Sequence, residues 1–484
     1  MTKTEVDWSE VARLVLLSRA LDRLEIEQLT PQGKVKYQFS AAGHELSQVL
    51  LALALDHPHD AATVYYRSRP FVLASGMTLA EALAGGMARL GGPSEGRDVG
   101  VMFNLPRRER AMVLPTSGDV GAQYSPAAGW AQAGCYRARV LGETEWDGAL
   151  GVALGGDGSV AANGFWAALN AATTQRLPMI FFIEDNAYGL SVPSTYQVPG
   201  GDIAANLASY GNLRILSGDG ADPVEASNLI TDAVEHTRTG AGPCLLRLCV
   251  PRLEGHTFID DQAYKSDAVR ADEAARDPLP RLQDYLHAEG RLSAADWDEM
   301  AADIRAEVEA AVAGAEARAE PDPETVQRFV FFDGRAPHAG GLRPEGALLS
   351  ADFDAVPERR GPRVNMIDAI RRTLEAELEA NPRVLVFGED VGVKGGVHGA
   401  TRDMQLRFGA ERVSDTSLSE DGIMGRAKGM ALAGLLPVPE IQFRKYADPA
   451  HEQLTDIGLL RWLSAGKFAA PVVVRIPVGF GKVT

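Results

Sequence analysis

Two short polar segments contain residue types that could together hold a metal ion and an anion. Residues 156–159 (Gly-Asp-Gly-Ser) and residues 185–188 (Asp-Asn-Ala-Tyr) each follow an apolar run. A glycine turn that opens a helix exposes backbone N–H groups, which can bind a diphosphate. Mg²⁺ prefers oxygen ligands, and Asp157, Asn186 and the backbone carbonyl of Tyr188 could supply them. The two segments therefore predict a site for Mg²⁺ and a diphosphate.

The glycine turn also has a simpler explanation, because Gly-Asp-Gly alone is a common turn between a strand and a helix. The surrounding sequence favours the binding site. Residues 179–183 are typical of a buried parallel strand, and residues 161–175 could form the helix that connects it to the strand before. Open α/β sheets bind ligands at the edge where the strands end. Asp157 and Asn186 are therefore expected at the same edge.

The elements that would position this site alternate between strand and helix along the chain. With 484 residues, the chain is too long for one hydrophobic core. A helical, alanine-rich run at 294–319 is followed by a passage rich in proline, glycine and charge. We predict a first domain at 1–320, a linker at 321–362 and a second domain at 363–484.

The second domain repeats the strand and helix pattern of the first. Its sequence predicts a helix at 366–378, strands at 383–388, 437–441 and 471–476, and a glycine-rich turn at 392–399. The alternation on both sides of the linker predicts the α/β class. We expect two domains, each a mostly parallel sheet covered by helices on both faces.

Composition narrows the partners and the compartment. The formal net charge of -17 disfavours nucleic acid and anionic membranes as general partners. The first residues lack the layout of a signal peptide, and no apolar run is long enough to cross a membrane, so a cytoplasmic enzyme is expected. Cys135, Cys244 and Cys249 lack metal-ligand spacing, and we expect them to be thiols in the core.

Ordered motifs run through both halves of the chain. The first half contains Tyr66-Arg67, Gly-Ala-Gln at 121–123 and Pro-Arg-Leu-Glu-Gly-His-Thr at 251–257. Together these motifs resemble the α subunit of the 2-oxoacid dehydrogenase decarboxylases.

The motifs of the second half resemble the β subunit of the same enzymes. They are Gly-Glu-Asp-Val at 388–391, Asp-Thr-Ser-Leu-Ser-Glu at 415–420 and Pro-Glu-Ile-Gln-Phe-Arg-Lys-Tyr at 439–446. The resemblance covers nearly the whole chain and indicates a fusion of an α part with a β part.

This resemblance implies that both domains have the thiamine diphosphate-binding fold, with thiamine diphosphate and Mg²⁺ as cofactors. The implied reaction is the oxidative decarboxylation of a 2-oxo acid, with a branched-chain substrate favoured. The acyl group would pass to the lipoyl group of a dihydrolipoyl acyltransferase. The resemblance also implies a homodimer, and it leaves open whether the site forms within one chain or between two.

Two residues would take part directly in the implied chemistry. Glu420 would hydrogen-bond the aminopyrimidine ring and favour the tautomer that removes the proton from the thiazolium carbon. His256 would lie near the thiazolium, where a titrating imidazole could bond the diphosphate or move protons. Without its motif, Glu420 would be read as a solvated surface group and His256 as an ordinary loop histidine.

Other residues would bind the cofactor. Arg252 and Arg67 suit phosphate geometry, and a surface ion pair is the alternative for each; the phosphate role is favoured for Arg252 and, by a smaller margin, for Arg67. Val120, Phe443 and Tyr446 would pack near the aminopyrimidine, and core packing explains the two aromatic residues almost as well. The predicted cofactor-binding residues are Tyr66, Arg67, Val120, Gly156, Asp157, Gly158, Ser159, Asn186, Arg252, His256, Glu420, Phe443 and Tyr446.

The chain departs from the family pattern in several places. Residues 96–102 lack the histidine that α subunits often carry after a Gly-Arg pair, which puts one proton donor in doubt. Asp185 stands where an asparagine is usual and adds a negative charge near the diphosphate. The rest of the β pattern would lie beyond Thr484, so we expect the sequence to be a fragment, and a chain ending there would not be expected to be active.

Other functions remain open. Pyruvate is a close second choice of substrate. A transketolase-like carboligase would share paired cofactor domains, but the order of the motifs argues against it. A non-catalytic scaffold that binds the lipoyl-carrying core would explain the missing histidine, but the retention of Asp157 and Glu420 argues against that interpretation.

Overall fold

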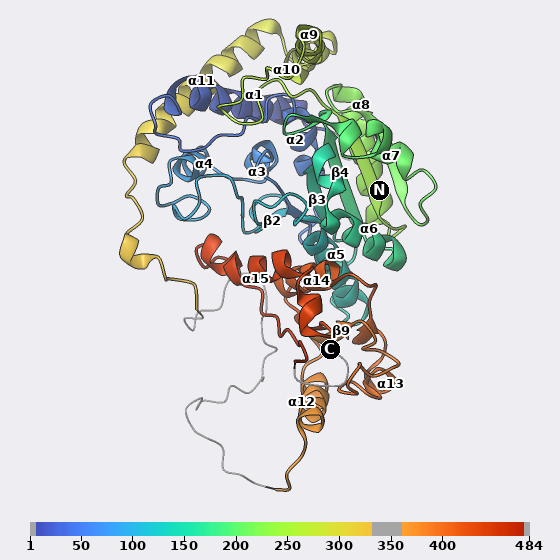
Figure 1. Cartoon of the computed structure of the whole chain (residues 1–484). Helices are drawn as coiled ribbons and strands as arrows, with labels where there is room; N and C mark the ends of the chain where they lie inside the picture. Colours follow the sequence, from blue (N-terminus) through green and yellow to red (C-terminus); the bar gives the residue numbers. More distant parts are fainter. Residues whose placement is uncertain (1–5, 332–360, 479–484) are drawn as a thin grey trace.

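The first half of the chain folds around a parallel sheet with the strand order β2-β1-β3-β4-β8-β7. The computed structural model describes residues 6–331 and 361–478. Figure 1 shows helices around this sheet, in blue to yellow, and the second half of the chain in orange and red. The strands are β1 (Ala61–Thr63), β2 (Met112–Leu114), β3 (Gly151–Gly156), β4 (Met179–Asp185), β7 (Arg214–Asp219) and β8 (Cys244–Cys249).

Helices surround the sheet of the first half, and a short hairpin follows β4. The hairpin strands are β5 (Tyr188–Gly189) and β6 (Val192–Pro193). The helices are α1 (Trp8–Leu24), α2 (Glu45–Ala54), α3 (Arg69–Ala74), α4 (Leu79–Gly86), α5 (Tyr124–Arg139), α6 (Asn163–Gln175), α7 (Ile203–Asn206), α8 (Pro223–Arg238), α9 (Asp267–Ala275), α10 (Pro278–Ala288) and α11 (Ala294–Glu316).

The central strand β4 is buried on both faces. Ile180 and Phe182 pack in the core formed with α1 and α2, whereas Phe181 and Ile183 pack in the core formed with α5 and α6. Successive side chains of a strand point to opposite faces, so a strand covered on both sides needs a continuous apolar run. The predicted α/β class is confirmed, and β4 lies where the apolar run at 179–183 predicted a strand.

The second half contains a smaller parallel sheet with the order β10-β9-β11. The helix predicted at 366–378 and the strands predicted at 383–388 and 437–441 are present as α12, β9 and β11. The elements are α12 (Met366–Ala380), β9 (Val384–Gly388), α13 (Met404–Phe408), β10 (Val413–Asp415), α14 (Glu420–Leu432), β11 (Leu436–Glu440) and α15 (His451–Leu463).

The strand predicted at 471–476 is reduced to a single bridge between Glu440 and Arg475. The backbone carbonyls of Pro437 and Pro439 accept hydrogen bonds from this segment at 3.1 and 2.9 Å. Proline has no N–H group, so neither residue can donate a bond in return. Only part of the hydrogen-bond ladder forms. The apolar pattern of the segment therefore predicted a full strand where the structure has one bridge.

The two halves share one core at the crossing of α5 and α14. Trp130 of α5 and Met424 of α14 belong to the same buried cluster. A Cβ atom on Gly429 would lie 2.0 Å from the carbonyl oxygen of Pro126, and one on Gly129 would lie 2.2 Å from that of Arg426. Only glycine permits backbones to approach so closely. This crossing holds the second half against the sheet of the first.

Three other predictions concern the whole chain. All three cysteines are free, with Cys244 buried and Cys135 and Cys249 partly buried. Among the described residues, no helix combines the length and the apolar character that a membrane span requires. Most of the predicted linker, from 332 to 360, lies outside the described residues, so the domain boundaries stay predictions.

Substituting Gly429 with alanine tests the importance of the helix crossing. We expect Gly429→Ala to lower the free energy of unfolding by about 1–3 kcal/mol, because the methyl group would overlap the backbone of α5. Chemical denaturation followed by circular dichroism measures this change. Gly458→Ala is the matched control, because that glycine lies exposed in α15 with no atom within 4 Å of the added carbon. Equal stability of the two variants would contradict the prediction.

Candidate functional site

A cavity of about 480 Å³ lies at the edge of the large sheet where the strands end. Its walls come from the loops that follow β1, β2, β3, β4 and β8, together with Phe39 from the loop before α2 and Val101 from the segment before β2. This is the edge at which parallel α/β sheets bind ligands. The cavity brings together these predicted site residues: Tyr66, Arg67, Val120, Gly156, Asp157, Gly158, Ser159, Asn186, Tyr188, Arg252 and His256.

Asp157 lies on the turn after β3 and is only 4% exposed. Its Oδ2 atom is buried and has no hydrogen-bond partner. Burial raises the pKa of this carboxyl, the negative charge of Asp185 raises it further, and the resulting pKa is about 7. A buried carboxylate oxygen without a partner is costly, and a bound cation would compensate it. The environment of Asp157 therefore fits a metal ligand.

Asn186 and Tyr188 follow β4 and line the same cavity. The Oδ1 atom of Asn186 accepts a hydrogen bond from the backbone N–H of Tyr188 at 3.2 Å. An amide oxygen has a second lone pair, so this contact leaves Oδ1 able to bind a cation. Together with Asp157, these residues offer the hard oxygen ligands that Mg²⁺ prefers.

The negative charge of Asp185 is compensated inside the protein. Its carboxylate forms an ion pair with Arg247, with an N···O distance of 2.7 Å, and accepts the backbone N–H of Ala187 at 2.9 Å. The carboxylate serves to fix the end of β4. The extra charge that the sequence suggested near the diphosphate is therefore paired with Arg247, although it still acts on the nearby Asp157.

Arg67 and Arg252 bring positive charge to the cavity without a matching carboxylate. Each is only 1% exposed, and neither forms an ion pair among the described residues. Their N–H groups bond neutral oxygens, which include the backbone carbonyl of Leu190 at 2.8 Å from Arg252. The Nε atom of Arg252 is buried without a partner. Burial, and then the charge of Arg67, lowers the pKa of Arg252.

His256 lies at the edge of the cavity on the loop after β8. Its ring packs edge-on against Phe39 and Tyr66, which stack on each other with centroids 4.1 Å apart. The carboxylate of Asp260 accepts the backbone N–H of His256 at 2.6 Å and so fixes the loop. Burial and the nearby charges of the two arginines lower the pKa of His256 to about 4. The imidazole is therefore neutral at neutral pH.

Ser159 has a structural partner inside the turn. Its hydroxyl lies 2.6 Å from the hydroxyl of Tyr124 and donates to the carbonyl of Gly156 at 2.6 Å. The hydroxyl therefore shapes the turn that carries Asp157, and the loop after β3 presents its backbone to the cavity.

The predicted residues of the second half do not line this cavity. Glu420 is the first residue of α14, and its neighbour Asp421 accepts a hydrogen bond from Ser125 at 2.8 Å. Ser125 comes two residues after Gln123, which does line the cavity. Helix α14 therefore begins beside the cavity loop. Burial raises the pKa of Glu389 to about 7, with a further contribution from the charge of Glu420.

Phe443 and Tyr446 lie on a short turn after β11. Their rings pack edge-on against each other with centroids 5.6 Å apart, and Phe443 also contacts His398. Tyr446 is 43% exposed. The two rings form an aromatic cluster of their own, and their predicted contact with a cofactor stays a prediction.

Several lining residues were not predicted from the sequence. Phe39 lies in a loop without periodic signal, and Leu190 and Val192 belong to the hairpin after the metal-ligand segment. Gln123 belongs to the Gly-Ala-Gln motif, for which the sequence predicted no role. Its side chain donates a hydrogen bond to the carbonyl of Leu154 at 3.1 Å. Only for Gln123 did the sequence contain a usable signal.

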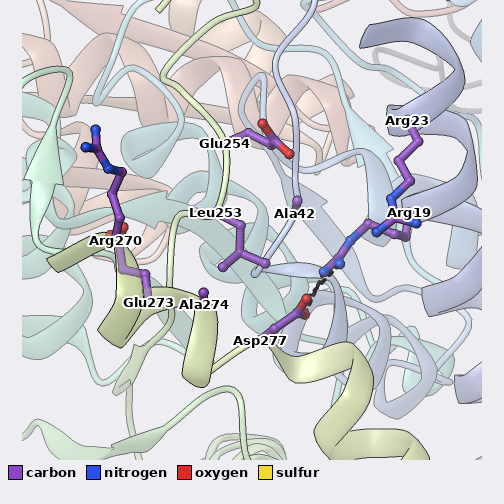
Figure 2. Close-up of a pocket in the computed structure, with 9 residues that line it drawn as sticks. All are labelled: Arg19, Arg23, Ala42, Leu253, Glu254, Arg270, Glu273, Ala274 and Asp277. Carbon is purple, nitrogen blue, oxygen red and sulfur yellow. Dashed lines mark hydrogen bonds and ion pairs between the residues drawn. The ribbon is translucent and has the colours of Figure 1, made fainter. Parts of the chain in front are cut away.

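A second cavity of about 240 Å³ lies beside α1 and α9 and is shown in Figure 2. It is also rich in charge, but its buried charges are paired. Arg19 bonds Asp277 at 2.9 Å, the dashed contact in Figure 2, and Glu273 bonds Lys265 at 2.8 Å. Arg23 and Glu254 are exposed to solvent. Without uncompensated buried charge, this cavity is a weaker candidate than the one at the sheet edge.

Two family profiles match the sequence. The profile described as Dehydrogenase E1 component matches residues 12–324. The profile described as Transketolase, pyrimidine binding domain matches residues 363–483. The boundary between the two matches falls in the passage that joins the large sheet to the small one.

Individual relatives divide in the same way. The chain is 32% identical over 330 residues to the 2-oxoisovalerate dehydrogenase subunit alpha of Bacillus subtilis (strain 168), which covers 68% of this chain and 96% of that protein. It is 46% identical over 119 residues to the 2-oxoisovalerate dehydrogenase subunit beta of Pseudomonas aeruginosa, covering 24% of this chain and 34% of the relative. It is 44% identical over 126 residues to the pyruvate dehydrogenase E1 component subunit beta of Leifsonia xyli subsp. xyli, covering 26% of this chain and 37% of the relative. The chain thus spans about a third of the length of these two beta relatives.

Anion binding at the sheet edge can be measured with inorganic pyrophosphate and Mg²⁺. We expect the unaltered protein to bind them in isothermal titration calorimetry, and Arg252→Gln to weaken binding about tenfold or more, because a buried charged donor is lost. Arg23→Gln alters an exposed arginine of the second cavity and should leave binding unchanged. An equal effect of both substitutions would contradict the assignment.

Proposed function

The chain belongs to the family of dehydrogenase E1 components, and from this we propose that it decarboxylates a 2-oxo acid with thiamine diphosphate as its cofactor. The match to a transketolase-type pyrimidine-binding domain supports the choice of cofactor, because such a domain would receive the other end of the same molecule. Bound thiamine diphosphate would supply a nucleophilic carbon and an electron sink for loss of carbon dioxide.

The observation that carries this proposal is the uncompensated charge in the sheet-edge cavity. Arg67 and Arg252 are buried without carboxylate partners among the described residues, and Oδ2 of Asp157 is buried without any partner. A diphosphate would compensate the two guanidinium groups, and Mg²⁺ would compensate the carboxylate. We propose Asp157, Asn186 and the carbonyl of Tyr188 as the metal ligands.

Glu420 and His256 are the residues that we propose for proton transfer. Helix α14 begins with Glu420 next to the cavity loop, which supports a role at the pyrimidine end of the cofactor. The neutral imidazole of His256 can accept or share a proton at the other end. Once a diphosphate compensates Arg67 and Arg252, the charges that help lower the pKa of His256 are removed, and the pKa should rise toward neutrality.

We favour a branched-chain 2-oxo acid as substrate. The alpha relative, which is matched over 96% of its length, is a 2-oxoisovalerate dehydrogenase subunit. The cavity also contains the apolar side chains of Val101, Val120, Leu190 and Val192, which suit a branched hydrocarbon tail. Pyruvate is the second candidate, because a pyruvate dehydrogenase beta subunit matches the second half nearly as well as its 2-oxoisovalerate counterpart does.

The proposal extends to partners. In the proposed reaction the acyl group passes to the lipoyl group of an acyltransferase. The disulfide of that lipoyl group is reduced as the acyl carbon is oxidised. We also propose a homodimer, supported by exposed apolar side chains near both parts of the site. Val120 is 51% and Leu190 60% exposed in the first half, and Leu418 is 85% exposed beside Glu420.

Turnover with different donors tests the reaction. The protein is mixed with Mg²⁺, thiamine diphosphate and an artificial electron acceptor, and reduction of the acceptor is followed by absorbance. We expect activity with 3-methyl-2-oxobutanoate, lower activity with pyruvate and none with xylulose 5-phosphate. Activity with xylulose 5-phosphate alone would indicate a carboligase, and absence of turnover with all three would indicate a scaffold.

Glu420→Gln tests the proposed proton transfer. We expect turnover to fall by roughly a hundredfold or more, because an amide cannot exchange the proton, while the affinity for thiamine diphosphate stays largely unchanged. Asp157→Ala is the contrasting variant, in which Mg²⁺ and cofactor binding should both weaken. Full activity of Glu420→Gln would refute the role of the carboxyl group.

A further inference from the structure

A buried histidine outside the cavity lining contacts the proposed metal ligand Asn186. His44 immediately precedes α2 and is 0% exposed. Its Nε2 atom lies 3.1 Å from Nδ2 of Asn186. His44 is not among the residues that line the cavity, so it contacts the amide from inside the protein.

This contact matches the orientation that the backbone N–H of Tyr188 gives to the amide of Asn186, when the neutral His44 ring carries its proton on Nδ1. The Nδ2 group of an asparagine can only donate hydrogen bonds, so Nε2 of His44 must accept. The Oδ1 atom receives the backbone N–H of Tyr188 at 3.2 Å and keeps a lone pair. If the amide were rotated by 180°, its NH₂ group would point at the backbone N–H of Tyr188, and two donors would face each other. The rotation would also put the NH₂ group where a cation needs the oxygen. The hydrogen bond to His44 opposes that rotation.

Helix α2 also holds the strand that carries Asn186. Ser47 and Gln48 donate hydrogen bonds to the buried carboxyl of Glu184, at 2.8 and 2.7 Å. Glu184 lies in β4, two residues before Asn186. Helix α2 therefore holds Glu184 inside β4, and His44, directly before α2, contacts Asn186, directly after β4. Of these contacts, the one from His44 reaches the metal-ligand side chain.

We propose that His44 is a positioning residue that holds the amide of Asn186 with Oδ1 available to ligate Mg²⁺. The inference rests on the proposed function, because it requires Asn186 to be a metal ligand. Partners that orient metal ligands in this way contribute to metal affinity even though they do not touch the metal. Loss of the acceptor should therefore weaken Mg²⁺ binding and leave the fold intact.

The experiment compares substitutions of His44 that keep or remove the acceptor. The Kd of Mg²⁺ is measured by calorimetry at saturating thiamine diphosphate, and the Tm of the cofactor-free protein is measured in parallel. We expect His44→Leu to weaken Mg²⁺ binding about tenfold or more. We expect His44→Gln to stay within about threefold of the unaltered protein, because Oε1 of glutamine can take the place of Nε2. His44→Asn, which is too short to reach, should behave like His44→Leu and replaces it if that variant does not fold.

Ser47→Ala is the matched control. It removes a hydrogen bond from the same part of α2, but the bond goes to Glu184 and not to Asn186. We expect it to lower Tm while leaving the Kd of Mg²⁺ within about threefold.

Several outcomes would overturn the inference. One such outcome is an unchanged Mg²⁺ affinity in folded His44→Leu or His44→Asn. Another is a loss of Mg²⁺ affinity in His44→Gln or Ser47→Ala that equals the loss in His44→Leu. Failure of the unaltered protein to bind Mg²⁺ would instead overturn the proposed function, and this inference with it.

Discussion

The candidate site is defined by buried charges that have no ion-pair partner in the described part of the chain. Arg67 and Arg252 are almost completely buried at the end of a parallel sheet, and the carboxylate oxygen Oδ2 of Asp157 is buried without a partner in the same cavity. Unpaired buried charges are strongly unfavourable in a folded protein. A magnesium diphosphate would compensate both signs of charge at once. The cofactor proposed here is therefore the partner that these side chains lack.

The rest of the fold supplies what this arrangement requires. Helices cover both faces of the sheet, and the loops after β1, β2, β3, β4 and β8 form walls of the cavity at its edge. Neighbouring groups that are not part of the site have partners of their own: Asp185 is paired with Arg247, and Asp260 is bonded to the backbone of its loop. The close crossing at Gly129 and Gly429 then places the start of α14 beside the cavity loop. Among the described residues, Arg67, Arg252 and Asp157 of the site are left without an ion-pair partner.

The parts of the site that could be predicted from the sequence are those that follow from local pattern. Asp157 and Asn186 each follow an apolar run, and the ends of parallel strands meet at one edge, so their proximity was predictable. The contact of His44 with Asn186 joins segments that are distant in sequence and have no shared pattern, so no sequence signal could indicate it. The segment at 471–476 has the apolar composition of a strand, but the prolines that limit its pairing lie in the neighbouring strand. Whether Glu420 reaches the cofactor depends on how the two halves assemble, which no local pattern contains.

The most direct test of the central claim is the position of the metal in the bound protein. Crystals grown with thiamine diphosphate and Mn²⁺ in place of Mg²⁺ can be examined by anomalous diffraction. The account predicts a manganese peak in contact with Oδ2 of Asp157, Oδ1 of Asn186 and the carbonyl oxygen of Tyr188, with diphosphate oxygens against Arg252. A peak elsewhere in the molecule, with this cavity empty, would contradict it.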